Sequence, residues 1–181
     1  RKARKGSRIV YVPGNHDERS ALRAAFADHL YLPTQGKLYY TIEVTGLRLI
    51  MLDTVVPGED AGALDPTQLT WLEDTLSLRD GPSVIFMHHP PCITGIGYMD
   101  RIALDDGDAA KLGTLTRRFQ QVQRICCGHV HRGVIVHWSG TTVALCPSSA
   151  FQYVADLRAD ATPVTTGEQP GYQLHLWNGT E

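Results

Sequence analysis

Gly14-Asn15-His16-Asp17 follows the apolar run Arg8–Val12, with only Pro13 between them. Two later segments repeat this arrangement, in which an apolar run leads into a turn that carries imidazole groups. They are Val84–Met87 followed by His88-His89-Pro90-Pro91, and Ile125–Cys127 followed by Gly128-His129-Val130-His131. Apolar runs of this length are typical of buried strands, and Gly or Pro marks the turns. Because five of the eight histidines lie in these three turns, the sequence predicts a metal centre on loops at one end of a sheet.

The composition is that of a globular enzyme domain. At 181 residues with a formal net charge of −2, the chain can bury a core and is interpreted as one domain over residues 1–181. The charge gives no reason to expect a nucleic acid polymer or a membrane surface as partner. The chain contains no apolar stretch of about 18 residues, so the sequence predicts no membrane-spanning helix. The four cysteines do not suggest a disulfide framework, which favours reduced thiols in a cytoplasmic protein.

Strands and helices are expected to alternate early in the chain, with hairpins later. The clearest helix signal is Asp65 as N-cap, followed by Pro66 at the first position and Gln68 as the partner in a capping box. The other expected helices are 18–30 and 108–120, and 92–107 and 155–170 are expected to be loops. The expected strands are 8–12, 37–44, 47–52, 83–87, 123–127, 134–138, 141–145 and 172–177. This order predicts an α/β fold with a mixed sheet.

The three turns contain ligands that suit first-row transition metals, because imidazole nitrogen binds Zn, Mn and Fe and amide oxygen can complete such a site. His129 and His131 are two residues apart, so across a turn they can straddle two metals. Asn15 contributes an amide oxygen, and His16 is placed to face whatever the metal holds. Taken singly, the His-x-His pair also fits a surface role and the Gly-Asn-His-Asp stretch a tight turn. Their occurrence together favours the metal site.

This constellation resembles the calcineurin-like metallophosphoesterase superfamily, and within it the bacterial class III cyclic-nucleotide phosphodiesterases and glycerophosphodiesterases. Four further stretches are similar to that subfamily: Leu52-Asp53-Thr54, Gly62–Leu64, Gln68–Leu72 and Cys146-Pro147-Ser148-Ser149. The resemblance therefore covers essentially the whole chain. It implies a four-layer α/β/β/α sandwich and a dinuclear metal centre that activates water for in-line attack on phosphorus.

The resemblance also implies which residues would bind the metals. Asn15, His88 and His129 would bind the second metal, and His131 the first. His89 would support its neighbour by hydrogen bonding instead of binding a metal itself. Such ligands accept Fe, Mn, Zn and Co with modest discrimination, so two of these ions are expected in the complete protein.

Catalytic and substrate-binding roles follow from the same resemblance. His16 would contact the phosphate and protonate the leaving oxygen as a general acid, and Asp17 would orient it. Phe151 and Tyr153 would line the substrate cleft, where they could stack on a base, although packing is the alternative. The implied substrate is a small phosphodiester, with a 3′,5′-cyclic nucleotide ahead of glycerophosphodiesters.

One departure from the family pattern is that the Asp-x-His and the early Gly-Asp motifs, which supply the bridging carboxylate, are absent from this chain. We therefore expect a piece covering about the C-terminal two-thirds of the family domain and lacking its first βαβ portion. Without carboxylates to offset repulsion between two cations, this piece should bind at most one metal and be nearly inactive. Asp53 is the one acidic residue that could substitute, against its interpretation as a turn or substrate-loop residue.

Alternatives to a phosphodiesterase remain open at this point. A phosphomonoesterase could use the same scaffold, and a catalytically incomplete fragment or non-catalytic binding module could retain it. The hairpins at 37–52 and 133–145 could supply an edge for a homodimer.

Overall fold

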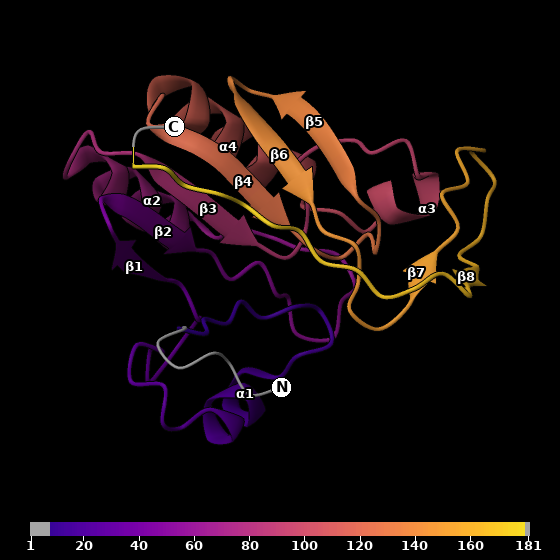
Figure 1. Ribbon diagram of the computed structural model, residues 1–181, viewed down its shortest axis with the longest axis horizontal. Coiled ribbons are helices and arrows are strands. Elements are labelled where there is room, and N and C mark those ends of the chain that lie inside the picture. Colours follow the sequence, from indigo (N-terminus) through magenta and orange to yellow (C-terminus); the bar gives the residue numbers. More distant parts are fainter. Residues whose placement is uncertain (1–7, 180–181) are drawn as a thin grey trace.

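The computed structural model describes residues 8–179, which form a six-stranded sheet, a small two-stranded sheet and four helices (Figure 1). The helices are α1 (Arg19–Ala25), α2 (Pro66–Ser77), α3 (Gly97–Asp100) and α4 (Asp106–Arg118). The strands are β1 (Tyr40–Val44), β2 (Leu47–Met51), β3 (Ser83–Met87), β4 (Val122–Cys127), β5 (Val134–Trp138), β6 (Thr141–Leu145), β7 (Gln152–Tyr153) and β8 (Thr165–Thr166). The predicted α/β class with a mixed sheet is confirmed.

The large sheet has the order β1-β2-β3-β4-β6-β5, and its four central strands are parallel. Ile50, Ile85, Ile125 and Val143 are paired in register across these strands and are fully buried. Burial of this kind is what keeps a parallel sheet together. Because the strands run in one direction, their carboxyl ends meet at one edge. The turns after β3 and β4, about 40 residues apart in sequence, therefore lie side by side.

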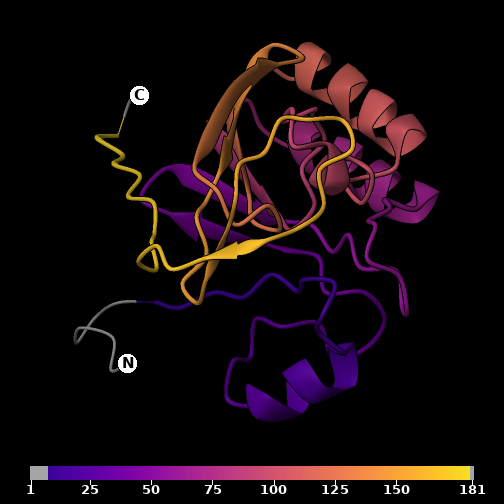
Figure 2. The same cartoon turned by 90° about the vertical axis from the view of Figure 1, so that its right-hand side faces the viewer.

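Helices α2 and α4 cover one face of the large sheet (Figure 2), and Leu72 and Leu112 are fully buried there. Asp65 caps α2 as predicted, since its Oδ1 accepts from the Gln68 amide at 2.8 Å. The predicted capping box is incomplete, however, because the Gln68 side chain does not return to the cap. Its Oε1 accepts from the Asp53 amide at 2.8 Å and its Nε2 donates to the Asp53 carbonyl at 2.9 Å, which ties α2 to the end of β2.

The predicted strand at 8–12 is wrong, because this segment forms no backbone ladder with a neighbour. The Tyr11 amide donates instead to the Tyr40 hydroxyl at 3.1 Å. Apolar side chains of 8–12 pack with α1 in a second, smaller core around Leu22 and Leu38. The predicted helix 18–30 is also too long, because regular helix ends at Ala25 and a turn follows.

The predicted strand at 172–177 is wrong for a similar reason. The segment is extended and crosses the sheet face opposite the helices (Figures 1 and 2), but side chains make its contacts. The Gln173 Nε2 donates to the Leu145 carbonyl at 2.7 Å, and His175 Nδ1 lies 2.8 Å from Arg124. A cavity of about 630 Å³ lies beneath this segment, away from the histidine turns.

The loop predicted over 92–107 includes the single turn of α3 and is anchored at Leu104, whose amide donates to the Pro90 carbonyl at 3.2 Å. All four cysteines are unpaired. The helices of residues 8–179 are too short and too polar for any of them to cross a membrane.

Candidate metal centre

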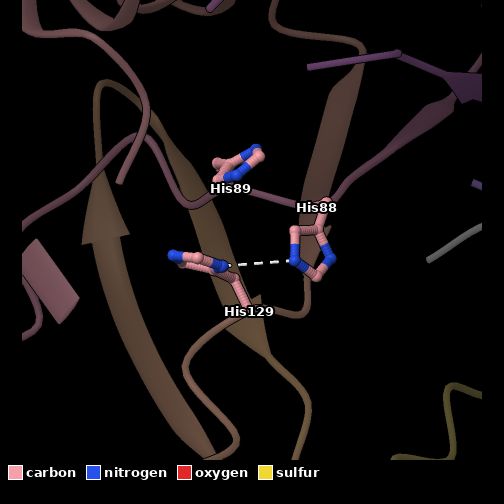
Figure 3. Close-up of side chains that lie close together, drawn as sticks. All are labelled: His88, His89 and His129. Carbon is pink, nitrogen blue, oxygen red and sulfur yellow. Dashed lines mark hydrogen bonds between the residues drawn. The ribbon is translucent and has the colours of Figure 1, made fainter. Parts of the chain in front are cut away.

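Three of the predicted site histidines, His88, His89 and His129, form a cluster at the carboxyl edge of the sheet (Figure 3). Each contributes a ring nitrogen, and these nitrogens all lie within 4.8 Å of one another. The parallel pairing of β3 with β4 brings the two turns together, and the Gly128 amide donates to the His88 carbonyl at 3.1 Å. Within residues 8–179 this is the one group of three or more His, Cys, Asp or Glu side chains spaced for a metal ion.

The Gly-Asn-His-Asp stretch is a tight turn that brings Asn15 to this cluster. Asp17 closes the turn, because its amide donates to the Gly14 carbonyl at 2.9 Å and its Oδ2 accepts from the Gly14 amide at 2.8 Å. A methyl group at Gly14 would approach the His88 ring to 2.8 Å, so glycine is required for this contact. The predicted pairing of Asp17 with His16 is not observed among residues 8–179, and Asp17 shapes the turn instead.

Asn15 Oδ1 and His129 Nδ1 both lie close to His88 Nε2. His88 Nε2 lies 2.9 Å from Asn15 Oδ1 and 3.2 Å from His129 Nδ1. Metal–ligand bonds to nitrogen and oxygen are about 2.0–2.2 Å long, which places ligand atoms around one ion about 3–3.5 Å apart. The distances from His88 Nε2 to the other two predicted ligands of the second metal therefore fit a shared ion.

Burial keeps the clustered imidazoles neutral, as metal ligands must be. Burial, followed by the neighbouring imidazoles of His89, His129, His131 and His16, lowers the pKa of His88 to about 2. Burial likewise lowers the pKa values of His89 and His129 to about 4. At neutral pH no proton competes with a cation for these rings.

The Gly-His-Val-His turn holds both of its histidines in an unfavourable backbone conformation. His129 has φ 64° and His131 has φ 54°, in the left-handed region that costs a non-glycine residue about 1–3 kcal/mol. The fully buried Val130 between them anchors the turn. His129 Nε2 and His131 Nδ1 are buried, and neither has a hydrogen-bond partner among the described residues. Strain and unpaired polar atoms at the same turn indicate a functional site.

His131 lies outside the three-histidine cluster and packs against two aromatic rings. Its ring centroid is 4.6 Å from that of Phe151 and 5.1 Å from that of Tyr153. His16 is exposed, and its ring is close enough to contribute, after burial, to the lowered pKa values of both His88 and His131. Phe151 and Tyr153, predicted to contact substrate, thus surround a candidate ligand, and their role toward substrate stays a prediction.

His89 is completely buried and uses both of its ring nitrogens. Its Nε2 is 3.0 Å from the Asp60 carbonyl, which can only accept, so Nε2 carries the hydrogen. Its Nδ1, 2.7 Å from Thr54 Oγ1, then accepts from the hydroxyl. A metal on either nitrogen would break one of these bonds, so the geometry favours the supporting role predicted for His89.

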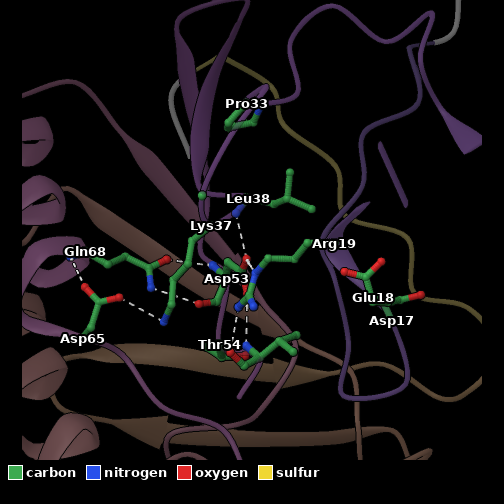
Figure 4. Close-up of polar contacts among 12 residues, drawn as sticks. Asp17, Glu18, Arg19, Pro33, Lys37, Leu38, Asp53, Thr54, Asp65 and Gln68 are labelled. Atoms are coloured by element: carbon green, nitrogen blue, oxygen red, sulfur yellow. Dashed lines mark hydrogen bonds and ion pairs between the residues drawn. The ribbon is translucent and has the colours of Figure 1, made fainter. Parts of the chain in front are cut away.

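Asp53 is not part of the histidine cluster and lies in a buried ion pair (Figure 4). Arg19 Nε and Nη2 donate to its two carboxylate oxygens at 2.7 and 2.8 Å. The Leu38 and Val55 amides donate to the same carboxylate at 2.7 and 3.1 Å. The idea that Asp53 could replace the missing metal-binding carboxylate is therefore wrong.

Comparison with known proteins identifies the family of this chain. The family model described as Calcineurin-like phosphoesterase matches residues 1–133. The chain belongs to the calcineurin-like phosphoesterase family. A probable glycerophosphodiester phosphodiesterase of Arcobacter nitrofigilis is 35% identical over 92% of this chain and 61% of its own length. A cAMP/cGMP dual specificity phosphodiesterase of Mycobacterium tuberculosis is 31% identical over 98% of this chain and 55% of its own.

A 3′,5′-cyclic adenosine monophosphate phosphodiesterase of Escherichia coli is 31% identical over 80% of this chain and 50% of its own length. The chain thus spans about half to three-fifths of the length of these relatives. A solved dimetal phosphatase of Danio rerio has the same fold, with a TM-score of 0.57 and 19% identity over 76% of this chain and 60% of its own. The predicted metallophosphoesterase fold is confirmed.

Proposed function

We propose that this protein is a metal-dependent phosphodiesterase that hydrolyses a small phosphodiester, with a 3′,5′-cyclic nucleotide as the first candidate substrate. The observation that carries the proposal is that Asn15 Oδ1 and His129 Nδ1 lie 2.9 and 3.2 Å from His88 Nε2. Relatives named as cyclic-nucleotide and glycerophosphodiester phosphodiesterases supply the substrate class.

Asn15, His88 and His129 would hold one metal ion, and His131 would contribute to a second in the complete protein. A metal bound there supplies Lewis-acid activation of water and neutralises phosphate charge. Because the three proposed ligands are neutral, a divalent ion would keep its full charge, which suits an anionic diester. The described residues add no carboxylate to this cluster, so we infer at most one metal for this chain. Fe, Mn, Zn and Co remain the candidates.

His16 would act on the substrate directly. It is exposed at the turn whose preceding residue, Asn15, faces His88, and it is near enough to His131 to influence its pKa. An imidazole at that place can bind the phosphate and give a proton to the leaving oxygen. A cavity of about 260 Å³ beside it is lined by Asn15, His16 and residues 17–19, 55, 57 and 58.

Phe151 is 39% exposed beside His131, and we propose that its ring contacts the group attached to the phosphate. A purine or pyrimidine would stack on this ring, whereas a glycerol would not. The glycerophosphodiester alternative is favoured by the 35% identity to a relative of that name.

The unpaired cysteines fit a cytoplasmic location. A homodimer through the hairpins stays a proposal.

Steady-state hydrolysis by the purified complete protein, in which both metals are expected, tests this proposal. Cyclic AMP, glycerophosphoethanolamine and p-nitrophenyl phosphate should be compared at equal concentration, with added Mn²⁺ and with a chelator. We expect the two diesters to be preferred over the monoester and all activity to be lost with the chelator. Faster turnover of the monoester, or chelator-resistant hydrolysis that survives His88→Ala, would overturn it.

A further inference from the structure

Asp60 lies in the loop between β2 and α2, and its side chain contacts Asn15, which is 45 residues earlier in the chain. The side chain is exposed, and its Oδ1 accepts from Asn15 Nδ2 at 3.3 Å. The two ends of the Asn15 carboxamide therefore have different partners. The NH₂ group faces Asp60, and the oxygen faces His88 Nε2 at 2.9 Å.

The orientation of this carboxamide decides whether Asn15 can bind a cation. Its oxygen carries lone pairs, whereas the NH₂ group has only hydrogens to present. Rotation by about 180° would point hydrogens at the proposed metal position. A carboxylate accepts hydrogen bonds and cannot donate one, so Asp60 favours the orientation with the NH₂ toward itself and the oxygen toward His88.

Asp60 is itself held in place by His89. The His89 Nε2–H donates to the Asp60 carbonyl at 3.0 Å, and the opposite ring nitrogen accepts from the Thr54 hydroxyl at 2.7 Å. The loop lies directly against this ring, because a methyl group added at Gly62 would overlap it. Backbone bonds fix the far side of the loop, from the Gly62 amide to Ala103 at 3.0 Å and from the Asp105 amide to Gly62 at 2.8 Å.

We propose that Asp60 is a positioning residue that fixes the Asn15 carboxamide with its oxygen toward the metal position, and that His89 acts through Asp60. The inference rests on the proposed metal site but concerns a residue that the family resemblance did not single out. Loss of a group that orients a metal ligand commonly weakens metal binding about 10–100-fold. Asp60→Ala should fall in that range.

The test compares Asp60→Ala with Asp60→Asn, which keeps an acceptor oxygen, and with Glu59→Ala, which removes the adjacent exposed carboxylate. Mn²⁺ dissociation constants from isothermal titration calorimetry should rise about 10–100-fold in Asp60→Ala. They should rise by about threefold or less in Asp60→Asn and stay at the wild-type value in Glu59→Ala. Thermal unfolding midpoints of all three should match wild type. Equal dissociation constants for wild type and Asp60→Ala would overturn the inference.

A second measurement separates this inference from the proposed function. Side-chain amide resonances of Asn15 in the metal-free, ¹⁵N-labelled protein report its orientation without any metal. We expect two separate, slowly exchanging NH₂ signals in wild type and Asp60→Asn, and rapid exchange with solvent in Asp60→Ala. If wild type binds no Mn²⁺ but shows this difference, the metal site fails and the positioning by Asp60 stands. Identical spectra for wild type and Asp60→Ala would refute the positioning role.

Discussion

Removing the Asp53 carboxylate should destabilise the protein more than almost any other change outside the hydrophobic core. Asp53 is fully buried, and the Arg19 side chain that it pairs with is 16% exposed. The Arg19 guanidinium makes three described hydrogen bonds, two to Asp53 and one to the Val55 carbonyl at 2.7 Å. In Asp53→Ala it keeps only the bond to Val55. The Leu38 amide also loses its acceptor.

Breaking a buried ion pair from one side costs about 3–5 kcal/mol. For a chain of this size each kcal/mol lowers the unfolding midpoint by about 2–4 °C, so we expect a fall of about 6–20 °C. Differential scanning calorimetry would measure it. Asp156→Ala is the matched control, because it removes an Arg–carboxylate pair on the surface and should leave the midpoint unchanged.

A double-mutant cycle assigns the loss in Asp53→Ala to the ion pair. If the pair with Arg19 is the cause, Asp53→Ala should cost distinctly less in an Arg19→Ala background than in wild type. An Asp53→Ala midpoint within about 2 °C of wild type would refute the reasoning, as would full additivity of the two changes.

Three further predictions concern the site. Gly62→Ala should lower the free energy of unfolding, measured by urea denaturation, by about 1–3 kcal/mol, because it forces a methyl group against the His89 ring. Gly167→Ala is the control and should be neutral, because a methyl group there meets nothing within 4 Å. Equal urea midpoints for the two variants would contradict this. Burial lowers the pKa values of His89 and His129 from 6.5 to about 4, so between those pH values the unfolded chain binds protons that the folded chain does not. Stability should therefore fall as pH drops from about 6.5 to 4 and be flat above about pH 7, and a midpoint constant down to pH 4 would exclude the shifts. In the complete protein, His16→Ala should lower kcat for the diester at least about 100-fold with unchanged metal affinity. An unchanged kcat would remove its role as general acid.

The sequence was sufficient to find the ligand turns because each lies behind an apolar run, and parallel strands carry such turns to one edge. Asn15, His88 and His129 were predicted together and lie together. The prediction was weaker where the outcome depended on partners distant in the chain. Residues 8–12 and 172–177 have the apolar pattern of strands, but a pattern does not show whether a neighbouring backbone is available for pairing.

Asp60 and Asp53 show the same limit for side chains. Nothing in the acidic loop around Asp60 distinguishes it from Glu59, because its role comes from His89, 29 residues later. Asp53 could be taken for a metal ligand until its partner Arg19, 34 residues earlier, was located. The Gln68 amide was predicted to complete a cap, but buried backbone groups of Asp53 compete for it, and burial makes those bonds more valuable.

The central claim is that Asn15, His88 and His129 bind a metal ion. Equilibrium dialysis of the purified chain against Mn²⁺, followed by elemental analysis for metal per chain, tests it most directly. At millimolar Mn²⁺ the account predicts close to one ion per chain for wild type and essentially none for His88→Ala when both variants are folded. Equal metal content in wild type and His88→Ala, or no metal in the wild type at millimolar Mn²⁺, would contradict it.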